Sequence, residues 1–186
     1  MKRKLIIALA LCLALALGIG GTMAYLTATT GPVVNTFTIG NVGLELKEEK
    51  GDLVDGKHQF KMVPGNTIEK DPTVTVTAGS EDCWLFVKLV KANNFDTYLT
   101  YDMAEGWTEL TGVEGVAGVY YRKVTQSETA QTFAVLANNQ VTVKDTVVQS
   151  DSFVAPTLTI SAAAIQQANI ADAATAYTNL PDAFKG

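Results

Sequence analysis

The sequence predicts an all-β fold, a jelly-roll-like sandwich of two sheets with a short C-terminal helix. From residue 33 onward, short runs rich in Val, Thr, Ile, Tyr and Phe are separated by Gly, Asn, Asp and Pro, which is typical of strands and turns. Several runs alternate apolar and polar residues, as strands with one buried face do. Because roughly ten strands fall within one domain, two packed sheets are favoured over one open sheet.

The expected strands, in chain order, are residues 33–39, 42–48, 58–63, 73–77, 84–91, 98–101, 118–124, 131–134, 140–148 and 156–161. In 73–77 the valines face one side and the threonines the other, and 140–148 begins with the same alternation at Val141 and Val143. The start of 84–91, Trp-Leu-Phe-Val, is apolar on both faces and predicts a central strand. Hairpin reversals are expected at the turn signals Pro64-Gly65-Asn66 and Asn138-Asn139.

One helix is expected near the C-terminus. Asn169 can cap it, with Asp172 three residues on to complement the free amides of the first turn. Its apolar face would carry Ile170, Ala174 and Tyr177, and Pro181 would end it. The preceding residues 161–167 are ambiguous, because alanine favours helix while the run continues a strand.

The N-terminus has the three parts of a cleavable signal peptide. Met-Lys-Arg-Lys is followed by an apolar stretch from Leu5 to Leu17 and by small residues ending at Ala24. Cleavage between Ala24 and Tyr25 is expected, which predicts a secreted protein that meets the membrane only through its uncleaved signal peptide. The alternative is an uncleaved anchor, but the apolar core falls short of the roughly 20 residues that span a bilayer.

The domain organisation follows from this cleavage. Residues 1–24 form the signal peptide, 25–35 a free N-terminal tail and 36–186 one β-sandwich domain. Cleavage removes three of the 14 Lys and Arg and none of the 19 acidic residues, so the net charge falls from −5 to −8. A nucleic-acid partner is not expected, since phosphate binding needs clustered positive charge.

The residues that could carry catalysis are few. His58 is the one histidine and no HExxH motif is present, so neither a metal site nor catalytic residues are assigned and no cofactor is expected. Cleavage leaves Cys83 as the one cysteine, and its apolar neighbours predict burial rather than reactivity. Two acidic clusters are expected to be solvated turns; they comprise Glu48, Glu49, Asp52 and Asp55, and Glu81 with Asp82.

A family resemblance is carried by motifs along nearly the whole chain. The N-terminal block GGTMAYLT at residues 20–27, followed by NTFTIGNV at 35–42 and LEL at 44–46, resembles the start of the TasA/camelysin family of Gram-positive bacteria. Weaker matches follow in the same order: Pro-Gly-Asn at 64–66, Lys-Asp-Pro-Thr-Val at 70–74, Val-Lys-Leu at 87–89, Gly-Val-Tyr-Tyr-Arg at 118–122 and Ala-Ile-Gln at 164–166.

The resemblance implies a jelly-roll subunit of an extracellular biofilm matrix fibre, whose signal peptide is cut by a SipW-type signal peptidase. Some members of the family have been called metallopeptidases, but with a single histidine this chain is not expected to be an enzyme. The partner would be the chain itself, in a head-to-tail homopolymer joined by donor-strand exchange. The tail would add to an exposed sheet edge of the next subunit. Its expected polymerisation residues are Tyr25, Leu26, Thr27, Ala28, Thr29, Val33 and Val34. The resemblance also implies that residues 162–167 continue the last strand.

Two other functions remain open at this stage. One is a camelysin-like cell-surface metallopeptidase that uses His58 and nearby carboxylates. The other is a sandwich-type adhesin or carbohydrate-binding module whose platform would include aromatic side chains such as Trp107 and the tyrosines.

Overall fold

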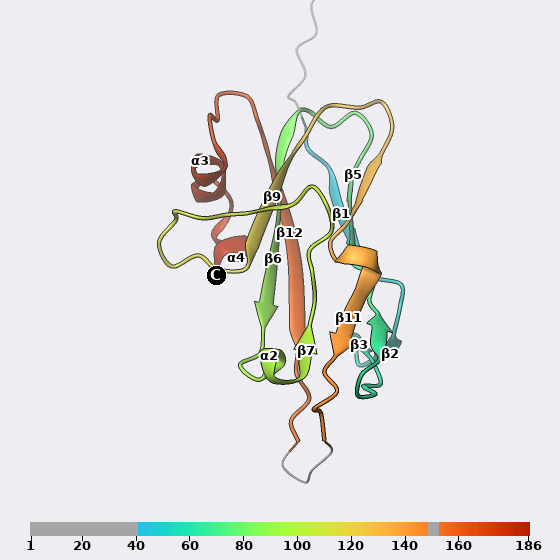
Figure 1. Cartoon of the computed structure of the whole chain (residues 1–186). Coiled ribbons are helices and arrows are strands. Elements are labelled where there is room, and N and C mark those ends of the chain that lie inside the picture. Colours follow the sequence, from blue (N-terminus) through green and yellow to red (C-terminus); the bar gives the residue numbers. More distant parts are fainter. Residues whose placement is uncertain (1–40, 149–152) are drawn as a thin grey trace, which may run out of the picture. The chain divides into compact units, whose positions relative to one another are not determined.

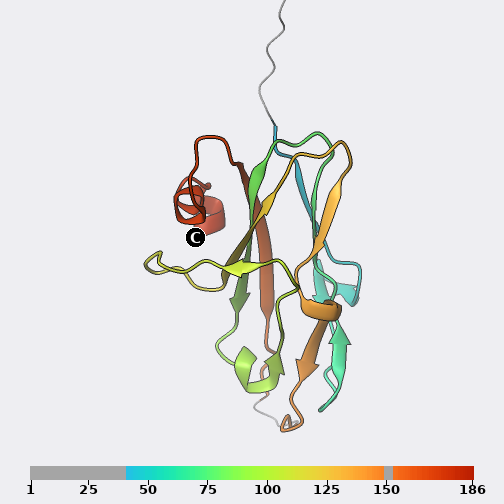
Figure 2. The same ribbon diagram turned by 45° about the horizontal axis from the view of Figure 1, so that its top comes forward.

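The computed structural model describes residues 41–148 and 153–186. These residues form antiparallel sheets with a few short helices, so the predicted all-β class is confirmed. One sheet has the strand order β12-β6-β9-β8, and the layer facing it contains the sheets β1-β5-β10 and β4-β11-β7 (Figures 1 and 2). The small sheet β2-β3 is a separate hairpin.

The strands are β1 (Leu44–Lys47), β2 (Asp52–Val54), β3 (Lys57–Gln59), β4 (Thr67–Glu69), β5 (Thr73–Val76), β6 (Cys83–Lys91), β7 (Leu99–Thr100), β8 (Thr108–Glu109), β9 (Val119–Val124), β10 (Gln131–Ala134), β11 (Gln140–Val143) and β12 (Leu158–Gln166). The helices are α2 (Phe95–Tyr98), the 3₁₀ turn η1 (Ala137–Asn139), α3 (Ala173–Thr178) and α4 (Asp182–Lys185).

The core between the two layers comes from alternate residues of the facing strands. Val74 and Val76 of β5 and Val141 and Val143 of β11 are buried, as their alternation with threonine predicted. Strand β6 pairs with β12 on one side and β9 on the other, and residues 83–87 are all buried. The prediction of a central strand there is confirmed, because both of its faces are covered.

The second face of β6 is covered by the C-terminal helices (Figure 1). Trp84 and Phe86 pack against Tyr177 of α3 and Phe184 of α4 in a second apolar cluster. The rings of Phe86 and Tyr177 have centroids 6.1 Å apart, and the Trp84 indole donates a hydrogen bond to the Ile170 carbonyl at 3.4 Å. Four-residue and six-residue helices are too short to be stable alone, so this packing is what holds them in place.

Several predicted elements need correction. Strands β2, β4 and β8 were not predicted, and the expected strand 58–63 is shorter and displaced, because the hairpin β2-β3 ends at Gln59. The expected strand 98–101 is divided between α2 and β7, and 140–148 ends as a strand at Val143. Residues Asn138 and Asn139 do not reverse a hairpin. They have φ of 53° and connect β10 to β11, which pair with β5 and β4 respectively.

The predicted helix exists, but its start was wrong. Asp172, not Asn169, is the N-cap of α3, and its carboxylate accepts a hydrogen bond from the Thr175 amide at 2.7 Å. Asn169 adopts a left-handed φ of 64° before the helix. Strand β12 continues through Gln166, which confirms the strand that the family resemblance implied for residues 162–166.

Candidate functional site

The sandwich has a cleft between two strands that each lack a partner on one side. Within the described residues, β1 pairs with β5 alone and β12 pairs with β6 alone. The two strands come from opposite layers and are not hydrogen-bonded to each other. On that side no other described strand pairs with the backbone N–H and C=O groups of β1 or β12, and an edge of this kind is the usual template for adding a further strand.

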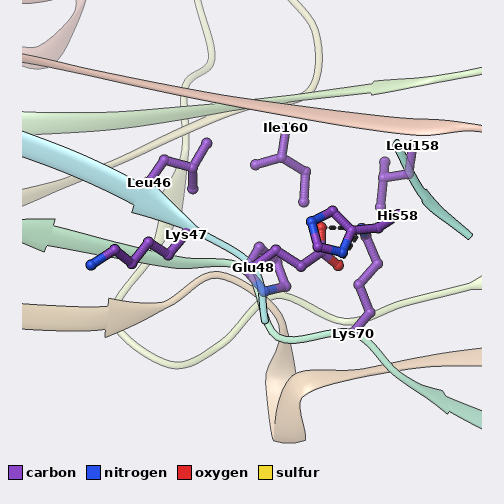
Figure 3. A pocket seen from close by; sticks show the side chains of 8 residues that line it. Leu46, Lys47, Glu48, His58, Lys70, Leu158 and Ile160 are labelled. Carbon is purple, nitrogen blue, oxygen red and sulfur yellow. Dashed lines mark hydrogen bonds and ion pairs between the residues drawn. The ribbon is translucent and has the colours of Figure 1, made fainter. Parts of the chain in front are cut away.

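Core-facing side chains are exposed in this cleft. Leu46 of β1 lies opposite Val74, so both point towards the space between the layers, yet 37% of Leu46 is exposed and Val74 is fully buried. On the other side, Leu158 and Ile160 of β12 are half-buried and pack against the edge of the same core. Figure 3 shows Leu46, Leu158 and Ile160 around a cavity of about 220 Å³.

The other end of the cleft is polar. Lys70 donates to both carboxylate oxygens of Glu48, at 2.7 and 2.9 Å, and side-chain exposure is 11% for Lys70 and 17% for Glu48 (Figure 3). The Lys70 ammonium also lies 5.2 Å from the ring centroid of Phe60. His58, on β3, completes this end, and its Nδ1 lies 2.7 Å from the Lys50 carbonyl oxygen. Lys70 and Glu48 therefore form an ion pair in which each charge neutralises the other.

This arrangement is suited to binding an extended segment rather than to proton transfer. An inserted strand would gain backbone hydrogen bonds from β1 or β12 and would cover Leu46, Leu158 and Ile160. Each Å² of apolar surface removed from water contributes about 25 cal/mol, so covering three partly exposed aliphatic side chains would stabilise the bound segment. The partly buried ion pair of Lys70 and Glu48 would then limit how far along the cleft an apolar side chain could sit.

Of the residues considered for catalysis, His58 and Glu48 line the same cleft, whereas Cys83 lies elsewhere in the core. Cys83 is completely buried in the core, as predicted, and burial raises the pKa of its thiol to about 11, with a smaller contribution from nearby Asp82. Within residues 41–148 and 153–186, no three His, Cys, Asp or Glu side chains are grouped to hold a metal ion. In the acidic clusters, Glu48 pairs with Lys70, and Asp82 accepts a hydrogen bond from the Gln126 amide.

Trp107 and Tyr101, which were expected to contribute to an aromatic binding platform, are packed against other side chains. Trp107 is half-buried, and its indole donates a hydrogen bond to the Ala134 carbonyl at 2.8 Å while the guanidinium of Arg122 covers its ring. Tyr101 packs edge-on against Phe95, and burial raises the pKa of its phenol to about 12. These rings contribute to the interior rather than forming a flat exposed surface.

The predicted cleavage residues Ala24 and Tyr25, the tail residues up to Val34 and the expected strand 33–39 lie outside the described residues. The cleft residues were not singled out from the sequence. Leu46, Leu158 and Ile160 look like ordinary core-facing strand residues there, and only the strand order shows that β1 and β12 lie at edges.

Comparison of the chain with protein-family models, with curated proteins and with solved structures gave no match. None of the helices in the described part of the chain has the length and apolar character needed to cross a membrane.

Proposed function

We propose that the chain is a secreted structural protein, a subunit of an extracellular biofilm matrix fibre that assembles by donor-strand exchange. In this proposal, residues 25–35 of one subunit insert into the cleft between β1 and β12 of the next. The finer description of the sandwich as a jelly roll belongs to the same proposal. The observation that carries it is that two strand edges from opposite layers, unpaired among the described residues, leave core-facing apolar side chains exposed.

The chemistry of the tail supports this assignment. Residues 25–35, Tyr-Leu-Thr-Ala-Thr-Thr-Gly-Pro-Val-Val-Asn, contain no charged side chain, so beyond the α-amino group at Tyr25 their insertion would bury no unpaired charge. Threonine and valine suit a strand, and alternate residues would face the core. Pro32 lacks an amide hydrogen, which places it where the inserted strand has no ladder bond to donate.

The polymer would be self-propagating. A tail that fills the cleft of another copy makes a heterologous contact, and such contacts build open filaments when the rotation between copies does not close a ring. Removal of the signal peptide by a SipW-type peptidase would free the tail, which links export to assembly. The membrane would be met only through the uncleaved signal peptide.

The experiment compares purified chains that start at Tyr25 and at Thr36. Negative-stain electron microscopy should show filaments for the first and folded monomers for the second. A synthetic peptide of residues 25–35 should raise the Tm of the shorter chain by several degrees, because it binds only the folded state. Filaments from the shorter chain would refute donor-strand exchange through this tail.

A matched pair of variants tests the cleft itself. Leu46→Lys places a charge among the apolar cleft residues and should abolish both filaments and the peptide-induced rise in Tm. Leu53→Lys is the control, because Leu53 is 67% exposed on the β2-β3 hairpin and does not line the cleft. Loss of assembly in both variants to the same extent would exclude the cleft as the specific acceptor.

A further inference from the structure

The sandwich has a second side, between β9 and β10, where strand edges from opposite layers also meet. Among the described strands β10 pairs with β5 alone. Strand β8 pairs with β9 at Tyr120 and Tyr121, so residues 122–124 have no described strand partner on that side. The second side therefore offers two edges to a further strand, as the cleft between β1 and β12 does.

Side chains tie the two layers together on the second side. The Trp107 indole donates a hydrogen bond to the Ala134 carbonyl of β10 at 2.8 Å. The side-chain amide of Gln131, also in β10, donates to the Thr125 carbonyl just after β9 at 2.8 Å. Strands β1 and β12, in contrast, are not hydrogen-bonded to each other at the cleft. The two sides of the sandwich are therefore built differently.

Arg122 of β9 points into the core on the second side. It lies between Tyr120 and Val124, whose side chains belong to the main core, and residues two apart on a strand share a face. Its guanidinium carbon lies 4.0 Å from the ring centroid of Phe133 and 5.3 Å from that of Trp107. Nε is buried and has no hydrogen-bond partner within the described structure. An inward-pointing cation thus occupies the place that aliphatic side chains have at the cleft.

An arginine is a costly side chain to place here. Desolvation lowers the pKa of Arg122, because burial disfavours its charged form. Cation–π attraction to the two rings offsets part of this cost. A well-packed apolar side chain of similar volume is nevertheless often as stabilising at a buried position, or more so. Inward-pointing charges are one of the means by which sheet edges avoid pairing with other strands, which gives this arginine a role beyond packing.

We propose that Arg122 closes the second side to donor strands, so that each subunit accepts one tail and the filament does not branch. The proposal rests on the donor-strand assembly proposed above. A tail inserted between β9 and β10 would displace Trp107 and enclose the guanidinium, and residues 25–35 contain no carboxylate to pair with it. At the cleft the same tail meets aliphatic side chains, and the cation there, Lys70, is already paired with Glu48.

The test uses filaments of the chain that starts at Tyr25 and a fluorescent peptide of residues 25–35. In filaments of the unmodified chain a neighbouring tail fills each cleft, so the peptide should label only the filament ends. Arg122→Met replaces the cation with a neutral side chain, and the peptide should then label the whole filament. The amount of peptide that sediments per subunit should rise about tenfold or more, because insertion no longer encloses an unpaired charge. Electron micrographs of this variant should show branched filaments.

Lys123→Met is the matched control. Lys123 is the next residue of β9, but its side chain lies on the opposite face of the sheet, with the ammonium 4.6 Å from the Trp84 ring centroid. The variant loses the same charge and should still be labelled only at its ends. A peptide with Thr27→Pro and Thr29→Pro lacks two amides for the ladder and should label neither variant. Arg122→Gln, which is also neutral, serves if Arg122→Met does not fold.

Three results would overturn this role of Arg122. Labelling along unmodified filaments at the level of Arg122→Met would mean that the second side is open despite the arginine. Labelling only at the ends of the folded neutral variant would mean that the charge does not close it. Equal labelling along Lys123→Met filaments would mean that net charge, not the inward position, controls binding. Absence of filaments from the unmodified chain would refute the donor-strand assembly itself, and this role with it.

Discussion

Leu46 and Val74 are direct neighbours across the β1-β5 pair, yet Val74 is fully buried while 37% of Leu46 is exposed. Both point into the space between the layers, so the difference arises from what lies beyond them. Val74 has strands on both sides, whereas β1 is the last described strand of its sheet. The pair marks the line at which the core of the described residues ends and the cleft begins.

This difference predicts unequal costs of truncation in the monomer. In the chain that starts at Thr36, Val74→Ala should lower the free energy of unfolding by about 2 kcal/mol, because it removes two buried methyl groups and leaves a cavity. Leu46→Ala should cost less than about 1 kcal/mol, since much of its side chain remains in water. Urea unfolding followed by fluorescence measures both values.

In the assembled chain the order should change. Because an inserted strand would bury Leu46, Leu46→Ala should raise the concentration needed for filament formation severalfold, whereas its monomer stays stable. Sedimentation of filaments over a concentration series measures this. If Leu46→Ala leaves the assembly concentration unchanged, the side chain stays exposed in the fibre and the proposed insertion site is wrong.

The strands that the sequence predicted well are those whose residue pattern is local. Strand β10 has the expected bounds, and β5 and β6 match closely, because alternation or continuous apolarity identifies them without knowledge of their partners. Strands β2, β4 and β8, of two or three residues, exist through pairing with other segments, so no local pattern reveals them.

The errors at the helix and the site have a related cause. Asn169 and Asp172 can both cap a helix, and the choice depends on how the chain leaves β12 to cover Trp84. The alanines of β12 favour helix alone, but Ala162 and Ala164 pair with β6 and face the core, and this pairing overrides their propensity. The cleft and the second side depend on strand order, which a single sequence does not contain.

The buried thiol of Cys83 should make the stability of the chain depend on pH. Burial raises the pKa of Cys83 from 9.0 to about 11, so between these values the unfolded thiol ionises while the folded thiol keeps its proton. The folded state then holds more protons, and stability should be full below pH 9 and fall as the pH rises above it. From pH 8.5 to 10, urea unfolding of Cys83→Ala should show a shallower decline than the unmodified chain.

The same burial predicts the thiol's chemical behaviour. A disulfide reagent such as dithionitrobenzoate should react with Cys83 at pH 8 only when the chain is unfolded, because the buried thiol is protonated and inaccessible. Rapid reaction of the native chain at the same pH would contradict the fully buried position of Cys83.

The ion pair at the polar end of the cleft should be strongly coupled. Lys70→Met or Glu48→Gln alone leaves the other group with little access to water, and each should destabilise the monomer by about 1–3 kcal/mol. The double variant should lose less than the sum of the single losses, by about 1 kcal/mol or more. A double-mutant cycle by urea unfolding measures this coupling.

The exposed pair between Lys47 and Glu45 is the control for that cycle. Its atoms are 2.9 Å apart, close to the separation of Lys70 and Glu48, but both side chains are more than half exposed. Solvent and side-chain entropy oppose such pairs, so no measurable coupling is expected. Equal coupling in the two cycles would show that burial does not strengthen the pair in the cleft.

The turn that begins β9 should be intolerant of any side chain. Gly118 has φ of +67°, and a Cβ there would lie 2.5 Å from the Leu89 carbonyl oxygen, so Gly118→Ala would force β9 away from β6. The two residues are also joined by a hydrogen bond, because the Leu89 amide donates to the Gly118 carbonyl at 2.8 Å. Gly112→Ala is the matched control, with φ of +79° but no atom within 4 Å of the added Cβ. Both variants should lose about 1 kcal/mol through the left-handed backbone, and Gly118→Ala should lose at least about 1–2 kcal/mol more through the close contact. Urea unfolding of the two variants separates these contributions, and equal losses would mean that β9 shifts away from β6 at no cost.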